Sequence, residues 1–388
     1  MGKKKNAGRL KLAFLLNNFY PYGGLEKSFL HIVHACISNK HQVTIFTMSW
    51  EGEKPQGVEV VLLFAKGMTN HGRALSFAHQ FQKLANPSAF DLIVGFNRLP
   101  GLDLYYNADV CYVLDIARRR SFLSRLTNRY RTYAAFEKAV FGKDSTTHIM
   151  YISEAEKKNY ISVYGTPDER FHCLPPGIDK KRIRKSRTAK IRRRVRDELR
   201  VGPDEFMLLM IGSDFSRKGV TRSIEALAAL PDELRKKTRL FVIGKGKEKP
   251  YLRQADRVGV ADRTHFLGTR QDVPRFLAGA DMLLHPAISE TAGNVILEAM
   301  VAGLSVLVTA VCGFAFHVKK ADAGSLVPNP FDQQEMNRLL AQMLQPDLLR
   351  AWGKNGSTYA DAVDLYSRPQ AAVKIIENIV AQKQAGGC

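Results

Sequence analysis

Short apolar runs alternate with segments of helical periodicity along this chain. In the first half the apolar runs occupy 10–19, 42–48, 58–64, 91–96 and 148–153, with helical patterns between several of them. In the second half they occupy 207–211, 240–246, 265–268, 282–284 and 305–311. Continuous apolar runs of this length are typical of buried parallel strands whose faces are covered by helices. The pattern therefore predicts an α/β protein built on parallel sheets.

The two alternations are separated by Leu174-Pro-Pro-Gly-Ile-Asp179, where two prolines and a glycine stop regular structure. A chain of 388 residues is too long for one ordinary core and suits two domains of about 180 residues each. We expect the first domain at 1–176 and the second at 177–366. The final segment, 369–382, is again helical in pattern.

The stretch 285–303 is predicted to form the end of a strand, a loop and a helix. It follows the apolar run 282–284, Pro286 ends the strand, and apolar residues recur at helical spacing from Gly293 to Gly303. The N–H groups at the start of such a helix favour an anionic group. We interpret the stretch as a ligand-binding loop.

Two glutamates flank that helix start. Glu290 lies in the loop and Glu298 in the helix, eight positions apart, with the N–H groups of Gly293 and Asn294 between them. One carboxylate can meet sugar hydroxyls and the other a ribose, with a diphosphate between them. The alternative is a surface glutamate together with one that only favours the helix dipole.

A basic pair follows another predicted strand. The run 207–211 enters Gly-Ser-Asp-Phe-Ser-Arg-Lys-Gly219 and then a helical pattern over 220–230. At this glycine-bounded turn Arg217 can bind a diphosphate through its bidentate fork, and Lys218 can bind it as a point charge. The Walker pattern Gly-x4-Gly-Lys-Ser/Thr is missing. The alternative is a basic pair on the surface.

The first strand leads into a glycine pair, Gly23 and Gly24, and then into a helical pattern over 25–37. Glycines at a strand-to-helix turn let the backbone approach a phosphate or a sugar closely. The alternative is an ordinary turn, because Gly-Gly turns are common.

Net charge is the strongest compositional signal. The chain has 58 Lys and Arg against 37 Asp and Glu, which gives +21 and a sequence pI near 9.8. Such a field attracts polyanions, whether nucleic acid, anionic lipid or a phosphorylated substrate. The stretch 180–200 alone has twelve Lys or Arg. It lacks aromatic stacking residues, which favours a solvated face over a nucleic-acid site.

Basic and aromatic residues are interleaved over 118–143. The apolar positions recur every three or four residues, as on one face of a helix, and long basic side chains beside such a face can meet anionic headgroups. The alternative is an amphipathic helix packed on its own sheet, with solvated arginines. We predict a membrane-binding segment that comprises Arg118, Arg119, Arg120, Phe122, Arg125, Arg129, Tyr130 and Arg131.

Cysteine usage and apolar runs bear on the compartment. The five cysteines are scattered, without paired or metal-ligand spacing, which fits a reducing cytoplasm. No apolar run approaches the roughly 18 residues that span a bilayer, and the first residues lack the apolar core of a signal peptide. No Asp-x-Asp triplet is present to chelate a metal on a sugar diphosphate. We therefore expect a cytoplasmic protein that needs no metal or other cofactor.

The motifs described above resemble the signature of the retaining nucleotide-sugar glycosyltransferases of the GT-B fold. Its core is Glu290-x7-Glu298, preceded by His-Pro and followed by Glu-Ala-Met-x-x-Gly. Long stretches are similar to the lipopolysaccharide core (heptosyl) glucosyltransferases I within that family, which glucosylate inner-core heptose. These include Tyr20-Pro-Tyr-Gly-Gly-Leu25, Asn70-His-Gly-Arg73, Gly95-Phe-Asn97, Pro100-Gly-Leu-Asp103, Arg129-Tyr-Arg131, Arg217-Lys-Gly219 and Thr309-Ala-Val-Cys-Gly313.

The resemblance implies a fold and a set of site residues. GT-B enzymes have two Rossmann-like domains facing a cleft, and their last helix, here within 367–388, packs back on the first domain. Glu290 would bind the hexose, Glu298 the ribose, and the loop 269–272 the nucleotide base through its backbone. The implied donor-binding residues are Gly23, Gly24, Arg217, Lys218, Thr269, Arg270, Thr291, Ala292, Gly293, Asn294 and Glu298.

Matching by position places Asp109 beside the reacting sugar carbon, where many retaining relatives have a His. A carboxylate there can stabilise positive charge as the glycosidic bond loosens, or orient the acceptor hydroxyl. The alternative is a turn or capping residue. The resemblance thus implies two catalytic residues, Asp109 and Glu290.

The expected function is transfer of glucose from UDP-glucose to inner-core heptose of lipopolysaccharide, with retention, at the inner face of the bacterial cytoplasmic membrane. The expected partners are UDP-glucose, the lipopolysaccharide inner core and an anionic membrane surface. One alternative is the same fold with another donor, such as UDP-galactose or UDP-GlcNAc, or with a phosphorylase or epimerase activity. Another is a nucleic-acid-binding protein, which charge alone favours and no recognised motif supports.

Overall fold

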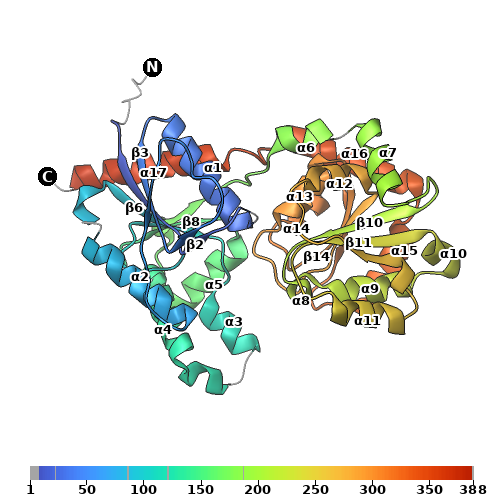
Figure 1. Cartoon of the computed structure of the whole chain (residues 1–388), viewed down its shortest axis with the longest axis horizontal. Coiled ribbons are helices and arrows are strands. Elements are labelled where there is room, and N and C mark those ends of the chain that lie inside the picture. Colours follow the sequence, from blue (N-terminus) through green and yellow to red (C-terminus); the bar gives the residue numbers. More distant parts are fainter. Residues whose placement is uncertain (1–7, 22, 85–86, 120–121, 187, 387–388) are drawn as a thin grey trace. The chain divides into compact units, whose positions relative to one another are not determined.

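The computed structural model describes residues 8–21, 23–84, 87–119, 122–186 and 188–386, which form two compact units (Figure 1). The first unit comprises 1–175 and 367–388, and the second comprises 176–366. The boundary lies one residue before the expected one. The predicted α/β class with two Rossmann-like domains is confirmed, because each unit has its own parallel sheet.

The first unit is built on a parallel sheet with the strand order β5-β3-β1-β6-β7-β8-β9, and a short parallel pair, β2 with β4, lies beside it. Five strands of the main sheet coincide with the predicted apolar runs and β2 lies within the run 10–19, while the short strands β4, β7 and β9 were not predicted. The strands are β1 (Lys11–Leu15), β2 (Asn18–Phe19), β3 (Gln42–Thr47), β4 (Ser49–Trp50), β5 (Glu59–Leu62), β6 (Leu92–Gly95), β7 (Leu104–Asn107), β8 (His148–Tyr151) and β9 (Phe171–Cys173).

Helices cover both faces of this sheet, and the last helix of the chain is among them (Figure 1). Ile376 and Ile379 of that helix join the buried core formed by residues such as Phe14 and Phe29. The helices are α1 (Gly24–Ser38), α2 (Asn70–Leu84), α3 (Tyr112–Arg119), α4 (Asn128–Phe141), α5 (Glu154–Tyr164) and α17 (Arg368–Gly386), with 3-10 turns η1 (Pro87–Ala89), η2 (Phe122–Leu126) and η3 (Asp168–Arg170).

The second unit has a parallel sheet with the strand order β12-β11-β10-β13-β14-β15. Its strands are β10 (Phe206–Ile211), β11 (Thr238–Ile243), β12 (Thr264–Phe266), β13 (Met282–His285), β14 (Ser305–Thr309) and β15 (Gly324–Val327). Its helices are α6 (Lys180–Ser186), α7 (Ala189–Glu198), α8 (Phe215–Lys218), α9 (Val220–Ala228), α10 (Asp232–Lys236), α11 (Lys249–Arg257), α12 (Val273–Gly279), α13 (Asn294–Val301), α14 (Ala315–Ala321), α15 (Gln333–Met343) and α16 (Pro346–Ala362), with the 3-10 turn η4 (Ala261–Arg263).

The strand orders place a topological switch point in each sheet. In the first sheet the chain passes from β1 to β3 and β5 on one side and then returns to β6 on the other side of β1. In the second sheet it passes from β10 to β11 and β12 and then returns to β13 on the other side of β10. Loops diverge at the carboxyl ends of such strand pairs, and open α/β sheets bind ligands there. The switch point of the second sheet lies between the loops that follow Ile211 and His285.

The chain leaves the first unit and returns to it through adjacent segments. The Ile178 N–H donates to the Leu365 carbonyl oxygen at 2.9 Å. Arg368, at the start of α17, donates through Nε to the Pro175 carbonyl oxygen at 3.0 Å. The second unit is thus one continuous stretch of chain whose two ends lie side by side.

The prediction of one amphipathic helix over 118–143 is wrong. The segment contains the end of α3, the 3-10 turn η2 and the helix α4, and Thr127 begins α4 by accepting a hydrogen bond from the Tyr130 N–H. Phe136 and Val140 are buried in the core of their own unit. The second half of the apolar stripe therefore packs on the sheet of the first unit.

The stretch 180–200 forms two helices, α6 and α7, and part of its charge is used inside the second unit. Arg196 is buried and its Nη1 lies 2.9 Å from Asp281 Oδ2, while Arg192 pairs with the other oxygen of that carboxylate at 2.5 Å. None of the described helices combines the length and the apolarity that a membrane span requires.

Candidate active site

The loops after β10 and β13 contact each other directly at the switch point of the second unit. The Ile288 N–H donates to the Arg217 carbonyl oxygen at 2.8 Å. Gly219 has φ +78°, and a Cβ atom built on it would lie 2.1 Å from the Pro286 carbonyl oxygen. Only a glycine fits this approach, because any side chain would both strain the backbone and clash. The basic pair is thereby fixed beside the loop that contains Glu290.

The loop 290–293 is also joined to the segment after β14. The Gly313 N–H donates to the Glu290 carbonyl oxygen at 3.2 Å, and the Phe314 N–H donates to the Ala292 carbonyl oxygen at 2.8 Å. A Cβ atom on Gly313 would lie 2.0 Å from the Thr291 carbonyl oxygen. Thr291 and Ala292 therefore belong to a loop whose backbone is fixed on both sides.

Glu290 is the centre of a charged cluster. Its Oε2 accepts a hydrogen bond from Lys218 Nζ, lies 3.4 Å from Arg217 Nη1 and lies 3.7 Å from His285 Nε2. The Lys218 and Glu290 side chains are 11% and 13% exposed, whereas that of Arg217 is 36% exposed. Arg217 is thus the member of the cluster most accessible to a ligand, and Lys218 lies deeper.

Burial changes the protonation equilibria in this cluster. Burial and the neighbouring Arg217 lower the pKa of Lys218 to about 8, while Cys312 and Asp214 act in the opposite direction. Burial and the two cations lower the pKa of His285 well below its ordinary value, so its imidazole is neutral. Of these two groups, Lys218 is the one whose charge changes closer to neutral pH.

The helix α13 begins at the point predicted from the sequence. Gly293 is its N-cap with φ +87°, and Asn294 is its first residue. Gly293 has no side chain to cap the helix, so the first N–H groups of α13 can bind an anionic group. Glu298 lies further along the same helix, is partly exposed and, like Asn294, already takes part in interactions within the protein.

Thr269 and Arg270 lie in the loop after β12. Arg270 Nε lies 3.1 Å from Asp272 Oδ1, and its guanidinium lies over the Phe276 ring at 4.9 Å. The Gly244 N–H donates to the Gly268 carbonyl oxygen at 2.9 Å, which joins this loop to the end of β11. The Arg270 side chain is therefore used within the protein, and the backbone of the loop is the part suited to contact a base.

The glycine pair of the first unit has an unexpected neighbour, Glu26. A Cβ atom on Gly23 would lie 1.7 Å from Glu26 Oε2, whereas none of the described atoms lies within 4 Å of a Cβ built on Gly24. Burial raises the pKa of Glu26, which also bonds to the Tyr20 hydroxyl. A ligand could therefore approach the backbone at Gly24, while the Glu26 carboxyl group covers Gly23.

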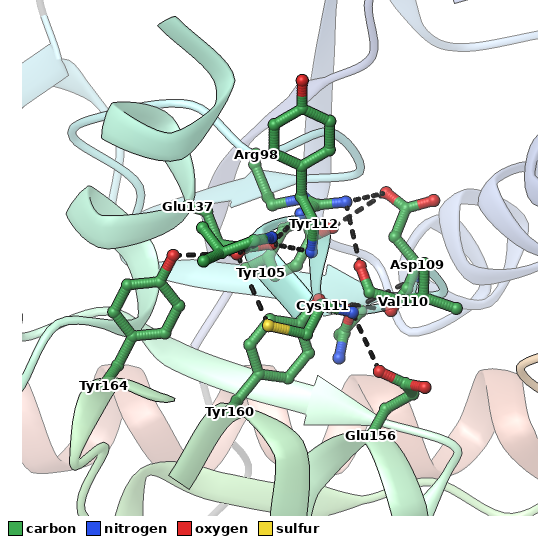
Figure 2. A network of polar contacts seen from close by, with 12 residues as sticks. Arg98, Tyr105, Asp109, Val110, Cys111, Tyr112, Glu137, Glu156, Tyr160 and Tyr164 are labelled. Carbon is green, nitrogen blue, oxygen red and sulfur yellow. Dashed lines mark hydrogen bonds and ion pairs between the residues drawn. The ribbon is translucent and has the colours of Figure 1, made fainter. Parts of the chain in front are cut away.

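Asp109 follows β7 at the carboxyl edge of the first sheet and is held by several neighbours (Figure 2). Its Oδ2 accepts from the Tyr105 hydroxyl at 3.3 Å and lies 3.4 Å from Arg98 Nη2. Its N–H donates to Asn107 Oδ1 at 3.3 Å, and its carbonyl oxygen accepts from the Tyr160 hydroxyl at 3.2 Å. The side chain is nevertheless 48% exposed, so it combines a fixed position with access to solvent.

The predicted membrane-binding segment is basic and partly apolar at its surface. Leu123 and Leu126 in η2 are 69% and 56% exposed. Arg129 and Arg131 on α4 are exposed, and Arg125 is partly exposed. Tyr130 is half-buried, and its ring lies 5.9 Å from that of Tyr112. Arg118 and Arg119 lie on α3 and Phe122 lies in η2, while Arg120 lies outside the described residues.

His285 and Arg98 are among the residues of these sites that were not predicted from the sequence. His285 is the last residue of a buried strand, and its position at the carboxyl end of β13 could have identified it. Arg98 gives no local signal, because its partners come from distant segments. Among the described residues there is no cluster of three His, Cys, Asp or Glu side chains suited to a metal ion.

Comparisons with known proteins give similarities in both units. The family model described as Glycosyltransferase Family 4 matches 22–182, and that described as Glycosyl transferases group 1 matches 191–359. The lipopolysaccharide glucosyltransferase WaaG of Escherichia coli K12 is 43% identical over 94% of this chain and 98% of its own length.

Solved structures agree with that similarity. A crystal structure of WaaG, a glycosyltransferase involved in lipopolysaccharide biosynthesis, has a TM-score of 0.90 at 42% identity and covers 94% of this chain and 99% of its own. A crystal structure of Anabaena HepE in complex with UDP and glucose has a TM-score of 0.73 at 18% identity and covers 95% of this chain and 100% of its own. The second likeness concerns the fold alone.

Proposed function

This chain belongs to the glycosyltransferases of the GT-B fold, among the lipopolysaccharide glucosyltransferases, and on that premise we propose that it transfers glucose from UDP-glucose to an inner-core heptose of lipopolysaccharide with retention of configuration. The observation that carries the proposal is the cluster of Arg217, Lys218 and Glu290 beside the N-terminus of α13, at the switch point of the second sheet. Two cations and a helix start suit a diphosphate, and a carboxylate beside them suits sugar hydroxyls.

Each residue then has a role in the proposed reaction. Arg217, the first N–H groups of α13 and the ammonium group of Lys218 bind the diphosphate and stabilise the negative charge that develops as UDP leaves. Glu290 binds hydroxyls of the transferred hexose, and Glu298 binds the ribose. Asp109 acts on the acceptor hydroxyl or stabilises positive charge at the sugar carbon.

We also propose that the reaction needs no metal ion. The charge on the leaving diphosphate can be met by Arg217, Lys218 and the start of α13, which together take the place of a chelated cation. Full turnover in excess EDTA is the expected result. Complete loss of turnover in EDTA, restored by a divalent cation, would show that this part of the proposal is wrong.

We further propose that the enzyme works as a peripheral protein on the inner face of the cytoplasmic membrane. The exposed leucines of η2 and the arginines of η2 and α4 support this, because apolar side chains flanked by basic ones suit an anionic interface. The enzyme would then meet its lipopolysaccharide acceptor at the membrane surface in which that acceptor is anchored.

The decisive experiment is product analysis. The protein is incubated with UDP-glucose, UDP-galactose or UDP-GlcNAc and with lipopolysaccharide truncated at the inner core, and the new linkage is determined by mass spectrometry and NMR. We expect an α-linked glucose on heptose from UDP-glucose alone. A product formed only from another donor would keep the fold and family but change the substrate, and a β-linked product would contradict retention.

A further inference from the structure

A single arginine connects the candidate catalytic residue of the first unit to a fully buried carboxylate (Figure 2). Arg98 lies in the loop after β6, and its side chain is 16% exposed. Its Nη1 donates to Glu137 Oε2, while its Nη2 lies 3.4 Å from Asp109 Oδ2 and also 3.4 Å from the Val110 carbonyl oxygen. The two ends of one guanidinium group therefore bind two carboxylates from different parts of the chain.

Glu137 is a fixed attachment point for this arginine. It lies on α4 with 0% exposure, and its carboxylate accepts from the Tyr112 N–H at 2.7 Å, the Val113 N–H at 3.2 Å and the Tyr164 hydroxyl at 2.8 Å. The first two donors are at the start of α3. A buried carboxylate with this many donors cannot move unless it loses several bonds at once. Glu137 thus holds Arg98 in one orientation.

Asp109 receives two donors on the same oxygen. Arg98 and the Tyr105 hydroxyl both contact Oδ2, and Figure 2 shows the other carboxylate oxygen pointing away from them. Burial raises the pKa of Tyr105 well above its ordinary value, so the hydroxyl keeps its proton and remains a donor. The rotation of the Asp109 carboxylate is therefore set by its buried neighbours, although the group itself is half-exposed.

We propose that Arg98 is a positioning residue for Asp109, held in turn by Glu137, so that one oxygen of Asp109 is presented to the acceptor. The proposal rests on the proposed function, in which Asp109 acts at the reacting centre. A carboxylate that must meet a hydroxyl in one geometry loses turnover when its orientation is no longer fixed, and displacement of a reacting group by about 1 Å can cost roughly 100-fold in rate. The residues assigned to UDP-glucose in the proposed function, Arg217, Lys218, Glu290 and Glu298, do not include Arg98.

The competing explanation is that Arg98 only neutralises Glu137 and so stabilises the fold. Removing Arg98 alone would leave a buried charge without its partner, which destabilises proteins whatever the catalytic role. The test therefore removes both charges together in the variant Arg98→Gln/Glu137→Gln. A second variant, Arg98→Lys, keeps a positive charge near Glu137 but lacks the fork that reaches both carboxylates.

The experiment is a double-mutant cycle on kcat that combines each Arg98 variant with Asp109→Asn. We expect each Arg98 variant to lower kcat about 100-fold, with the KM for UDP-glucose and the affinity for UDP unchanged. In the Asp109→Asn background the same changes should lower kcat less than about twofold, because a residue that acts through Asp109 has nothing left to position. Thermal melting and UDP titration of every variant monitor folding.

The outcomes distinguish a failure of the positioning role of Arg98 from a failure of the proposed role of Asp109. If the Arg98 variants lower kcat by the same factor with and without Asp109, or lower only the melting temperature, the positioning role is wrong. If Asp109→Asn alone retains the turnover of the unaltered protein, the proposed role of Asp109 fails first. Should Arg98→Gln/Glu137→Gln not fold, the Arg98→Lys cycle decides by the same criterion.

Discussion

Lys218 donates a hydrogen bond to Glu290, a residue 72 positions further along the chain. The contact neutralises part of the positive charge that a diphosphate would otherwise meet. In the proposed enzyme, Glu290 therefore has two effects, because it binds the hexose and restrains the lysine beside it.

The substitution Glu290→Gln is expected to separate these two effects. Turnover should fall by about 100-fold or more, because the carboxylate that binds the hexose is lost, while the affinity for UDP should stay the same or rise, because Lys218 is released for the diphosphate. Steady-state kinetics and calorimetric titration with UDP measure the two quantities.

Glu298→Gln is the matched comparison, with the same chemical change on the neighbouring helix. It should raise the KM for UDP-glucose more than it lowers kcat, because Glu298 is assigned to the ribose. A loss of UDP affinity in the Glu290 variant and not in the Glu298 variant would mean that the two roles are reversed.

The affinity for UDP-glucose should depend on pH through Lys218. Its pKa is lowered to about 8, so the ammonium group is present below that value and is lost as the pH rises through it. Affinity is therefore expected to be constant below this range and to fall above it. Calorimetric titrations from about pH 6.5 to 9.5 test this, with Lys218→Arg as the control that stays charged throughout. The same decline in the Lys218→Arg variant would assign it to another group.

Gly219→Ala should impair the proposed donor site without removing any charge. The new Cβ atom would lie 2.1 Å from the Pro286 carbonyl oxygen, so the two loops must separate. We expect at least a tenfold weaker affinity for UDP-glucose and a lower melting temperature. Gly259→Ala is the matched control, because Gly259 has φ +71° but no described atom within 4 Å of its Cβ position. It should cost only the backbone strain of about 1–2 kcal/mol.

Membrane binding should depend on Arg125, Arg129 and Arg131. Each basic residue near an anionic surface contributes on the order of 1 kcal/mol, so changing all three to Gln should weaken binding to anionic vesicles about 100-fold. Sedimentation with phosphatidylglycerol vesicles at low salt measures this, and raised salt should imitate the change.

The control for the membrane experiment removes the same charge elsewhere. Lys190, Arg193 and Arg194 are exposed on α7 of the second unit, and their change to Gln removes three positive charges outside the segment. If both triple variants lose binding equally, net charge and not the segment drives association. UDP affinity should be unaffected in either variant.

Local signals in the sequence located most strands and the loops that follow β10 and β13. Runs such as Met-Leu-Leu-Met-Ile in β10 are uninterrupted, and the loops that follow have the glycines and the proline that end a strand. By contrast, β7 (Leu-Tyr-Tyr-Asn) and β9 (Phe-His-Cys) are short and contain polar residues, so their pattern differs little from that of a loop. These two segments form strands only because they pair with the neighbouring strands of the sheet.

The site of the first unit could not be assembled from the sequence in the same way. Asp109, Arg98 and Glu137 come from three separate segments and meet only through tertiary packing. Glu137 occupies a polar position in a basic helical pattern, which gives no sign that it is fully buried. The break before α4 was detectable, because Thr127 is a favourable N-cap residue within the run of aromatic and basic positions.

The return of α17 to the first unit has a consequence for the order of folding during synthesis. Domains usually fold as units from the N-terminus as the chain emerges. Here α17, which supplies Ile376 and Ile379 to the core around Phe14, is translated after every residue of the second unit. The second unit can therefore complete its fold while the first unit still exposes apolar core residues, and a translational pause or truncation before Ser367 would leave the first unit, not the second, as the target for chaperones and proteases.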